Sequence, residues 1–352
     1  MGNAAAADSQ GVSKLLHSGS KGHLGRIPNL RVAIVNVLIV TPESPSLPLG
    51  NTVTASRWAE ILRTLGHHVD VSGEWDQQDC DLLIALHARR SALSIERFRH
   101  AHPLRPLVLA LTGTDIYGDI RTSQAAQQSV VWATHIVVLQ ERALDELDDA
   151  ARAKTHVIYQ SASPPVHWKQ PSADHFDVCV LSHLRVVKDP LRAAYAARLV
   201  PSESRIRVTH GGRVLEPEWE DKVRGEMAGN PRYRWVGEQS HEAGMQLLAA
   251  SRVLVQSSTI EGGANAIAEA VVCGVPILCS DIPGNVGMLG RDYPGYFRVG
   301  DTAQLADLMS RAEVDPNFYA KLLASIERLQ DRFTPERERE SWARLLEATS
   351  GS

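Results

Sequence analysis

The amino-acid sequence predicts an α/β protein with two doubly wound domains that face a common cleft. From Asn36 onward, short apolar runs alternate with polar segments of helical period, which is typical of parallel strands covered by helices on both faces. A segment rich in Pro and Ser at 160–174 interrupts this alternation, which then starts again. The chain has 352 residues, enough for two domains of ordinary size. Doubly wound domains place their loops at the carboxyl ends of the strands, so a cleft is expected there.

The first domain is expected at 35–165. Its strands are predicted at 37–41, 82–86, 107–111, 136–139 and 156–159, where nearly all side chains are apolar. The segment 52–65 has the spacing of an amphipathic helix, and Gly66 follows it. Glycine readily adopts the left-handed conformation that closes a helix, so we expect the helix to end there.

The second domain is expected at 166–334. Strands are predicted at 178–181, 206–210, 253–256, 277–279 and 296–299. Helices are predicted at 190–199, 217–228, 242–250, 265–272 and 302–311. Residues 315–346 also have helical composition, with a break near Pro335. The last segment, 335–352, is therefore expected to be a separate helix.

The composition argues against several classes of function. The formal net charge is −4 at pH 7 with both signs mixed, so no basic surface for nucleic acid is indicated. No apolar run reaches the ~18 residues of a membrane span. The four cysteines, Cys80, Cys179, Cys273 and Cys279, form no CxxC pair and predict free thiols in a reducing compartment such as the cytoplasm. No metal-ligand cluster, P-loop or GxSxG motif is visible, so no metal or cofactor is expected.

Residues 1–34 differ from the rest of the chain. They are rich in Ala, Ser, Gly, His and Lys, show no periodicity and lack the apolar core of a secretory signal. This composition predicts a disordered extension. Removal of residues 1–30 should therefore leave the fold and the turnover unchanged.

The run 259–282 contains the most informative pattern, two carboxylates eight positions apart around a Gly-Gly-Ala-Asn loop. If Asn265 opens a helix, Glu269 lies one turn into it and Glu261 stays on the preceding loop, so both can face the cleft. The free N–H groups at the start of a helix carry partial positive charge and suit a diphosphate. These features fit a nucleotide sugar, with Glu269 accepting hydrogen bonds from a ribose diol. The alternative is a pair of solvated helix acids.

Loop backbone and two cations complete this candidate donor site. The loop residues are Gly262, Gly263, Ala264 and Asn265. Glycine lets the backbone approach a bound ligand closely, so this loop and Glu261 are expected to hold sugar hydroxyls. Arg185 and Lys188 follow a predicted strand and can neutralise a departing diphosphate. The alternative for this pair is that they are ordinary surface cations.

Three strand ends in the first domain carry residues that suit an anionic acceptor. Gly50 and Asn51 form a strand-to-helix turn whose N–H groups can meet phosphate, and Arg57 on the following helix adds a cation. The alternative is a plain tight turn. Further candidate residues at two other strand ends are His87, Arg89, Arg90, Thr114 and Asp115. A lone histidine is commonly structural, and Asp115 could cap a helix, receive a proton from the acceptor or orient the substrate.

The run 259–282 resembles the donor-binding signature of retaining GT-B glycosyltransferases in family 4, in which two glutamates flank seven residues. Glu261 and Glu269 match the two acids. Arg185 and Lys188 lie where that family has its diphosphate cations, and His87 lies where it has a histidine beside the sugar. The resemblance implies a GT-B fold of two Rossmann-like domains, with a last helix that returns toward the first domain. It also implies catalytic roles for His87, Glu261 and Lys188.

A narrower resemblance extends over most of the chain from about Val35. The runs at 50–68, 85–93, 112–118, 261–271 and 284–302 are similar, in order, to the selenosugar synthases of selenoneine biosynthesis. That group joins selenium from selenophosphate to the anomeric carbon of a UDP-sugar, UDP-N-acetylglucosamine or a relative, and releases UDP. It implies a first domain that binds the acceptor and a second domain that binds the donor. The substrates would then be selenophosphate and a UDP-sugar, with no nucleic-acid or membrane partner.

Two other functions remain open at this stage. A family 4 enzyme could transfer the sugar to a hydroxyl of a small molecule or a lipid; the lipid version would need an amphipathic patch on the first domain, and no strong one is visible. An epimerase or a degenerate nucleotide-sugar-binding regulator is the third hypothesis. Intact Glu261, Glu269, Lys188 and His87 argue against degeneracy. The identity of the sugar, the anomeric outcome and the oligomeric state stay open.

Overall fold

The first of two six-stranded sheets is parallel, with the strand order β2-β1-β3-β4-β5-β6. A computed structural model of the chain describes residues 34–42 and 50–350, and the description that follows is confined to them. The strands are β1 (Asn36–Val40), β2 (His68–Ser72), β3 (Leu82–Leu86), β4 (Leu107–Leu111), β5 (His135–Val138) and β6 (Thr155–Val157). The central strands β3 and β4 are buried along their whole length, as expected for a parallel sheet with both faces covered.

Alternate side chains of this sheet enter two separate cores. Leu83, Leu107 and Leu109 pack on one face with Phe98 of α2 (Ala92–Ala101). Ile84 and its neighbours of the same parity pack on the other face against α1 (Gly50–Thr64). The remaining helical segments of this domain are η1 (Asp115–Asp119), α3 (Ile120–Thr122), α4 (Gln124–Trp132), η2 (Glu141–Glu146) and α5 (Asp149–Ala153).

The second sheet is also parallel, with the order β12-β11-β10-β7-β8-β9. Its strands are β7 (Phe176–Leu181), β8 (Ile206–Gly211), β9 (Tyr233–Trp235), β10 (Val253–Gln256), β11 (Ile277–Ser280) and β12 (Tyr296–Phe297). Its helical segments are η3 (Val186–Lys188), α6 (Arg192–Ala197), α7 (Glu218–Gly229), α8 (His241–Ala249), α9 (Asn265–Cys273), α10 (Pro283–Leu289), α11 (Thr302–Val314), α12 (Pro316–Glu327) and η4 (Gln330–Phe333). The side chains of this half form one continuous core.

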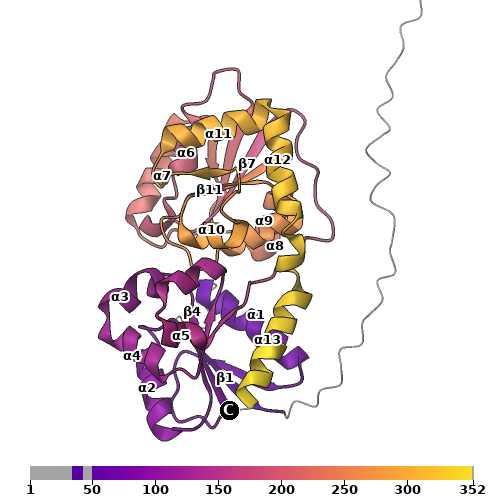
Figure 1. Ribbon diagram of the computed structural model, residues 1–352. Coiled ribbons are helices and arrows are strands. Elements are labelled where there is room, and N and C mark those ends of the chain that lie inside the picture. Colours follow the sequence, from indigo (N-terminus) through magenta and orange to yellow (C-terminus); the bar gives the residue numbers. More distant parts are fainter. Residues whose placement is uncertain (1–33, 43–49, 351–352) are drawn as a thin grey trace, which may run out of the picture. The chain divides into compact units, whose positions relative to one another are not determined.

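The last helix, α13 (Pro335–Ser350), lies beside α1 of the first domain, as the yellow ribbon in Figure 1 shows. Trp342 of α13 meets Trp58 of α1 edge to face, with 4.8 Å between ring centroids, and both are fully buried. Leu345 and Leu346 enter the same core. The first domain is therefore completed by residues from the far end of the chain.

The predicted fold class is confirmed, and most predicted elements differ from the observed ones by one or two residues at their ends. Two strands were not predicted, namely β2 and β9. Both are edge strands, and β9 has three residues, so neither carries the apolar run that marks a buried strand. The predicted strand at 296–299 is limited to Tyr296–Phe297. The predicted extension at 1–34 lies, except for Ile34, outside the described residues.

No helix within the described ranges is long and apolar enough to cross a membrane.

Candidate active site

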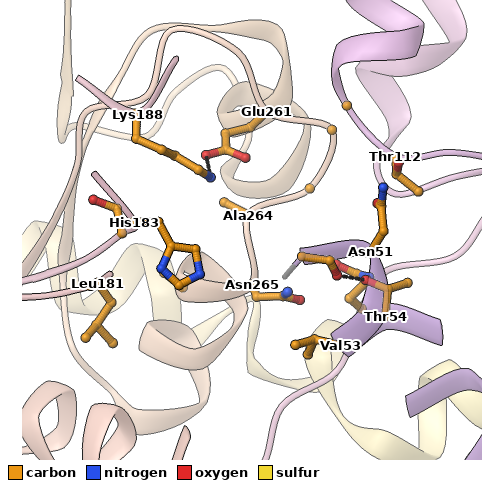
Figure 2. Close-up of a pocket in the computed structure, with 18 of the residues that line it drawn as sticks. Asn51, Val53, Thr54, Thr112, Leu181, His183, Lys188, Glu261, Ala264 and Asn265 are labelled. Carbon is orange, nitrogen blue, oxygen red and sulfur yellow. Dashed lines mark hydrogen bonds and ion pairs between the residues drawn. The ribbon is translucent and has the colours of Figure 1, made fainter. Parts of the chain in front are cut away.

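A cleft of about 460 Å³ lies where the carboxyl ends of strands from both sheets meet. The first domain contributes Gly50, Asn51, Val53, Thr54, His87, Arg90, Thr112, Gly113, Thr114, Leu139 and Gln160. The second domain contributes the loop after β7 and the loop that leads into α9 (Figure 2). It also contributes Gly211, the last residue of β8, and Gly212. Parallel strands align their carboxyl ends, and this is why segments far apart in the sequence converge here.

Glu261 and Lys188 form an ion pair inside the cleft. The Lys188 ammonium donates to Oε1 of Glu261 at 2.5 Å (Figure 2). The Gln256 amide donates to the same oxygen at 2.8 Å. The side chains of Lys188 and Glu261 are only 18% and 10% exposed. Removing charges from water is costly, so in the free protein each group compensates the other. A ligand that takes hydrogen bonds from Lys188 must share or replace this pairing.

Helix α9 begins at the cleft with Asn265, and no side chain caps it. Its first turn has no acidic residue and its N-cap position is Ala264, so its first N–H groups and partial positive charge are open to an anion. Glu269 lies one turn further and accepts a hydrogen bond from Nε2 of His241 at 3.2 Å. This hydrogen bond raises the pKa of His241 above its ordinary value. Both expected carboxylates, Glu261 and Glu269, therefore line the same cleft.

The glycines of the 261–264 loop lie against residues of the opposite domain. A Cβ on Gly262 would lie 2.3 Å from the carbonyl oxygen of Thr112, and one on Gly263 would lie 2.7 Å from Cβ of Leu139. Any larger residue would hold the two domains apart at this point. From the sequence, these glycines were expected to let the backbone approach a ligand closely. In the structure they let the two domains approach each other closely.

His87 ends β3 in a strained conformation. Its φ is +75°, in the left-handed region that non-glycine residues rarely adopt, and the side chain is buried. Its Nδ1 accepts the backbone N–H of Arg90 at 3.4 Å, so the proton of the neutral ring is on Nε2. Nε2 lies 3.1 Å from Oγ1 of Thr114 and 3.7 Å from a carboxylate oxygen of Asp119. Burial lowers the pKa of His87, which favours this neutral N–H donor form.

Two residues expected at the acceptor site do not line the cleft. Arg89 is not among the lining residues; its side chain is half exposed to solvent and pairs with Asp119 at 2.9 Å. Asp115 is fully buried and accepts backbone N–H bonds from Ala88, Thr112, Gly113 and Ile116. Its carboxylate ties the turn after β3 to the loop after β4. Asp115 therefore supports the wall of the cleft from behind and contributes no group to its surface.

Arg57 is likewise absent from the cleft surface. It donates to the Ser161 carbonyl at 3.3 Å and to the Asn265 side chain at 3.2 Å, and its Nε lies 3.5 Å from Glu338. These partners are 104 or more residues away in sequence. Arg57 is therefore engaged by protein groups and is not among the residues that line the cleft, so its expected role at the acceptor stays a prediction.

Arg185 lines the cleft as expected, together with His183, which sequence reasoning missed. Nδ1 of His183 accepts the Arg213 backbone N–H at 3.2 Å, so Nε2 is the protonated atom of its neutral ring. Burial, followed by the charges of Lys188 and Arg213, lowers its pKa. His183 could have been predicted from its position, because it lies two residues before Arg185 on the loop after β7. Gln256 and His241 were missed because neither belongs to a recognisable motif.

Within the ranges 34–42 and 50–350, no three His, Cys, Asp or Glu side chains converge in a way that could hold a metal ion.

Comparison with known proteins finds a family match within the second domain. Residues 166–327 match the family described as glycosyl transferases group 1. The chain is 23% identical over 324 residues to glycosyltransferase 1 domain-containing protein 1 of Xenopus tropicalis, covering 84% of this chain and 94% of that protein.

Solved structures with the same fold cover nearly the whole chain. HepE of Anabaena, in complex with UDP and glucose, aligns with a TM-score of 0.71 at 18% identity over 89% of this chain and all of its own. Sucrose-phosphate synthase of Thermosynechococcus elongatus aligns with a TM-score of 0.72 at 17% identity, over 90% of this chain and 99% of its own. These similarities extend across both sheets and the cleft, and they show the GT-B fold.

Proposed function

We propose that this protein, whose residues 166–327 match the family described as glycosyl transferases group 1, transfers a sugar from a UDP-sugar to the selenium of selenophosphate. The donor would be UDP-N-acetylglucosamine or a relative. The products would be UDP and a phosphoselenosugar. No metal or cofactor takes part in this proposal.

The donor half of the proposal rests on the second domain. The uncapped start of α9 offers N–H groups and partial positive charge, and Arg185 and Lys188 add two cations on the same side of the cleft. Glu269 can accept hydrogen bonds from ribose hydroxyls. Anabaena HepE, which has the same fold, binds UDP and glucose. A UDP-sugar is therefore the donor that these groups suit best.

The acceptor half rests on a single observation, the absence of acids from one wall of the cleft. Among the described residues, those that line the cleft from the first domain include no Asp or Glu, whereas Glu238, Glu261 and Glu269 all come from the second domain. The first-domain wall instead presents hydrogen-bond donors, including Arg90, Thr114 and Asn51. Such a wall favours an acceptor that is already an anion.

The protonation state of His87 favours this anionic acceptor over an ordinary hydroxyl acceptor. A hydroxyl acceptor needs a base, and His87 could supply one only through a free Nε2 lone pair. Its Nδ1 accepts an N–H, so Nε2 carries the proton and faces Thr114. Selenium of selenophosphate is a soft anionic nucleophile and needs no deprotonation. The main task of the protein would then be to position the substrates and to stabilise the leaving group.

The proposed transfer is balanced in atoms and electrons. An electron pair on selenium forms the bond to the anomeric carbon, and the bond from that carbon to the β-phosphate oxygen breaks with its pair going to UDP. Lys188 and Arg185 would stabilise the charge that develops on the diphosphate, so Lys188 must leave its pairing with Glu261. Water must later remove the phosphate from selenium to give a selenol.

The test combines mass spectrometry with two arginine variants. The wild-type protein, UDP-N-acetylglucosamine and selenophosphate should yield UDP and a product with selenium on the sugar. Arg90→Ala should raise the KM for selenophosphate about 10-fold or more and leave UDP affinity unchanged, because hydrogen bonds to charged groups contribute ~1.5–3 kcal/mol. Arg89→Ala is the matched control, since Arg89 pairs with Asp119 outside the cleft.

Thiophosphate serves as a second substrate with the same charge and a less polarizable nucleophile, and it should react more slowly. Faster transfer to a hydroxyl acceptor than to selenophosphate would reject the proposed acceptor. UDP release without selenium on carbon would reject it as well.

A further inference from the structure

A buried carboxylate on α13 is connected to the cleft through one arginine. Glu338 is 1% exposed and accepts hydrogen bonds from the indole of Trp58 at 2.8 Å and from the backbone N–H and hydroxyl of Ser161 at 2.8 and 2.5 Å. The guanidinium of Arg57 lies 3.5 Å from it. A carboxylate buried away from water is stable only when several hydrogen-bond donors or cations compensate its charge. The cluster ties together α1, the inter-domain segment and α13.

Arg57 extends this cluster to the residue that opens α9. Its Nη2 donates to Oδ1 of Asn265 at 3.2 Å, and its Nη1 donates to the Ser161 carbonyl at 3.3 Å. Asn265 also lines the cleft, beside Ala264 and Glu261 (Figure 2). The fixed fork of a guanidinium can hold several partners at once, which a lysine ammonium cannot do in the same geometry.

The contact fixes which way the Asn265 amide points. Guanidinium has only donors, so the side-chain atom facing Arg57 must be the oxygen. The NH₂ group is then the one left for the cleft. Without Arg57, the amide could rotate and present its oxygen to a ligand. Orienting this amide converts an ambiguous group into a hydrogen-bond donor.

We infer that Arg57, held by Glu338, is a positioning residue that orients the Asn265 amide to donate to an oxygen of the donor sugar. This inference rests on the proposed UDP-sugar donor. It explains why both terminal nitrogens of a cation close to the cleft donate to protein groups. The specificity for the sugar would then depend also on α1 and α13, which carry Arg57 and Glu338 and belong to the opposite domain.

The test compares the affinities for UDP and for the UDP-sugar by calorimetric titration. Asn265→Ala should weaken binding of UDP-N-acetylglucosamine about 3–10-fold and leave UDP binding within about twofold, because one hydrogen bond to the sugar is lost. Arg57→Met should weaken UDP-sugar binding to a similar or smaller extent, also without affecting UDP. Arg57→Lys should restore part of the loss. Arg63→Met, on the same helix and bonded to the Val69 carbonyl, is the matched control and should change neither affinity.

The double variant decides whether Arg57 acts through Asn265. If it does, Arg57→Met should have no further effect in the Asn265→Ala background. An undiminished effect in that background, or equal losses for UDP and UDP-sugar, would overturn the inference and mark Arg57 as purely structural. Asn265→Ala keeps the Arg57–Glu338 contact, so it gives a readout even if Arg57→Met unfolds. A wild-type protein that binds neither UDP nor a UDP-sugar would reject the proposed function and this inference with it.

Discussion

Replacing Gly262 by Ala should separate the two domains at the cleft with little effect on either core. The added Cβ would lie 2.3 Å from the Thr112 carbonyl oxygen and 2.7 Å from the Gly113 nitrogen. Both neighbours are backbone atoms, which cannot rotate away. Non-bonded heavy atoms approach to about 3.5 Å, so the loop and the opposite backbone must move apart by about 1 Å.

A shift of this size affects the reaction more than the fold. Displacement of reacting groups by about 1 Å can cost about 100-fold in rate, whereas overpacking typically costs about 1–3 kcal/mol of stability. We therefore expect Gly262→Ala to lower kcat/KM about 100-fold. The two domains should still unfold close to the wild-type temperature.

The assay is the rate of UDP release from a UDP-sugar and selenophosphate, measured beside thermal unfolding. Gly225→Ala is the matched control, because Gly225 lies in α7, where an added Cβ meets nothing within 4 Å. That control should keep full activity and gain about 0.5–1 kcal/mol of stability, since alanine favours a helix over glycine. An activity of Gly262→Ala within threefold of wild type would refute the reasoning.

Three further predictions concern Glu269, Asp115 and His210. Glu269→Ala should weaken UDP binding about 10–100-fold by calorimetry, and in an NMR titration it should return the raised pKa of His241 toward its ordinary value. An unchanged UDP affinity in a folded variant would remove Glu269 from the site. Asp115→Asn should cost about 2–4 kcal/mol in denaturant unfolding, because its NH₂ would face backbone N–H groups, whereas Asp79→Asn, at an exposed carboxylate, should leave the unfolding free energy unchanged. Burial lowers the pKa of His210 to about 4, below the ordinary 6.5. The contribution of the neutral ring to stability is therefore complete above pH 6.5 and falls as the pH drops toward 4. His210→Gln should flatten this pH dependence of the unfolding free energy.

The strands and the second-domain side of the site were predictable because their signals are local. A parallel strand buried on both faces appears as an apolar run, and the carboxylates of 261–269 lie on one loop and one helix. Fold and motif together were enough to bring Glu261, Glu269, Arg185 and Lys188 into one cleft.

The candidate residues that do not line the cleft have partners far away in sequence. Arg57 is an isolated cation on a helix until Glu338 and Asn265 are placed beside it, 281 and 208 positions later. Asp115 has the appearance of a helix cap or a base until the turn after β3 is seen to donate to it. Arg89 and Arg90 are neighbours with equivalent sequence context, and only the course of the backbone decides which of them faces the cleft. Such distinctions depend on tertiary contacts that have no local pattern.

The return of α13 makes the first domain discontinuous along the chain. Trp342, Leu345 and Leu346 supply part of its core, and Glu338 supplies the acceptor for the Trp58 indole. During synthesis this core stays incomplete until residues 335–350 have left the ribosome, so the second domain can finish folding earlier. A fragment that ends before Pro335 would expose the Trp58 ring and would leave its indole N–H without the acceptor that Glu338 provides. Expression of the first domain alone would therefore require residues 335–350 to be joined to it, for example through a circular permutation.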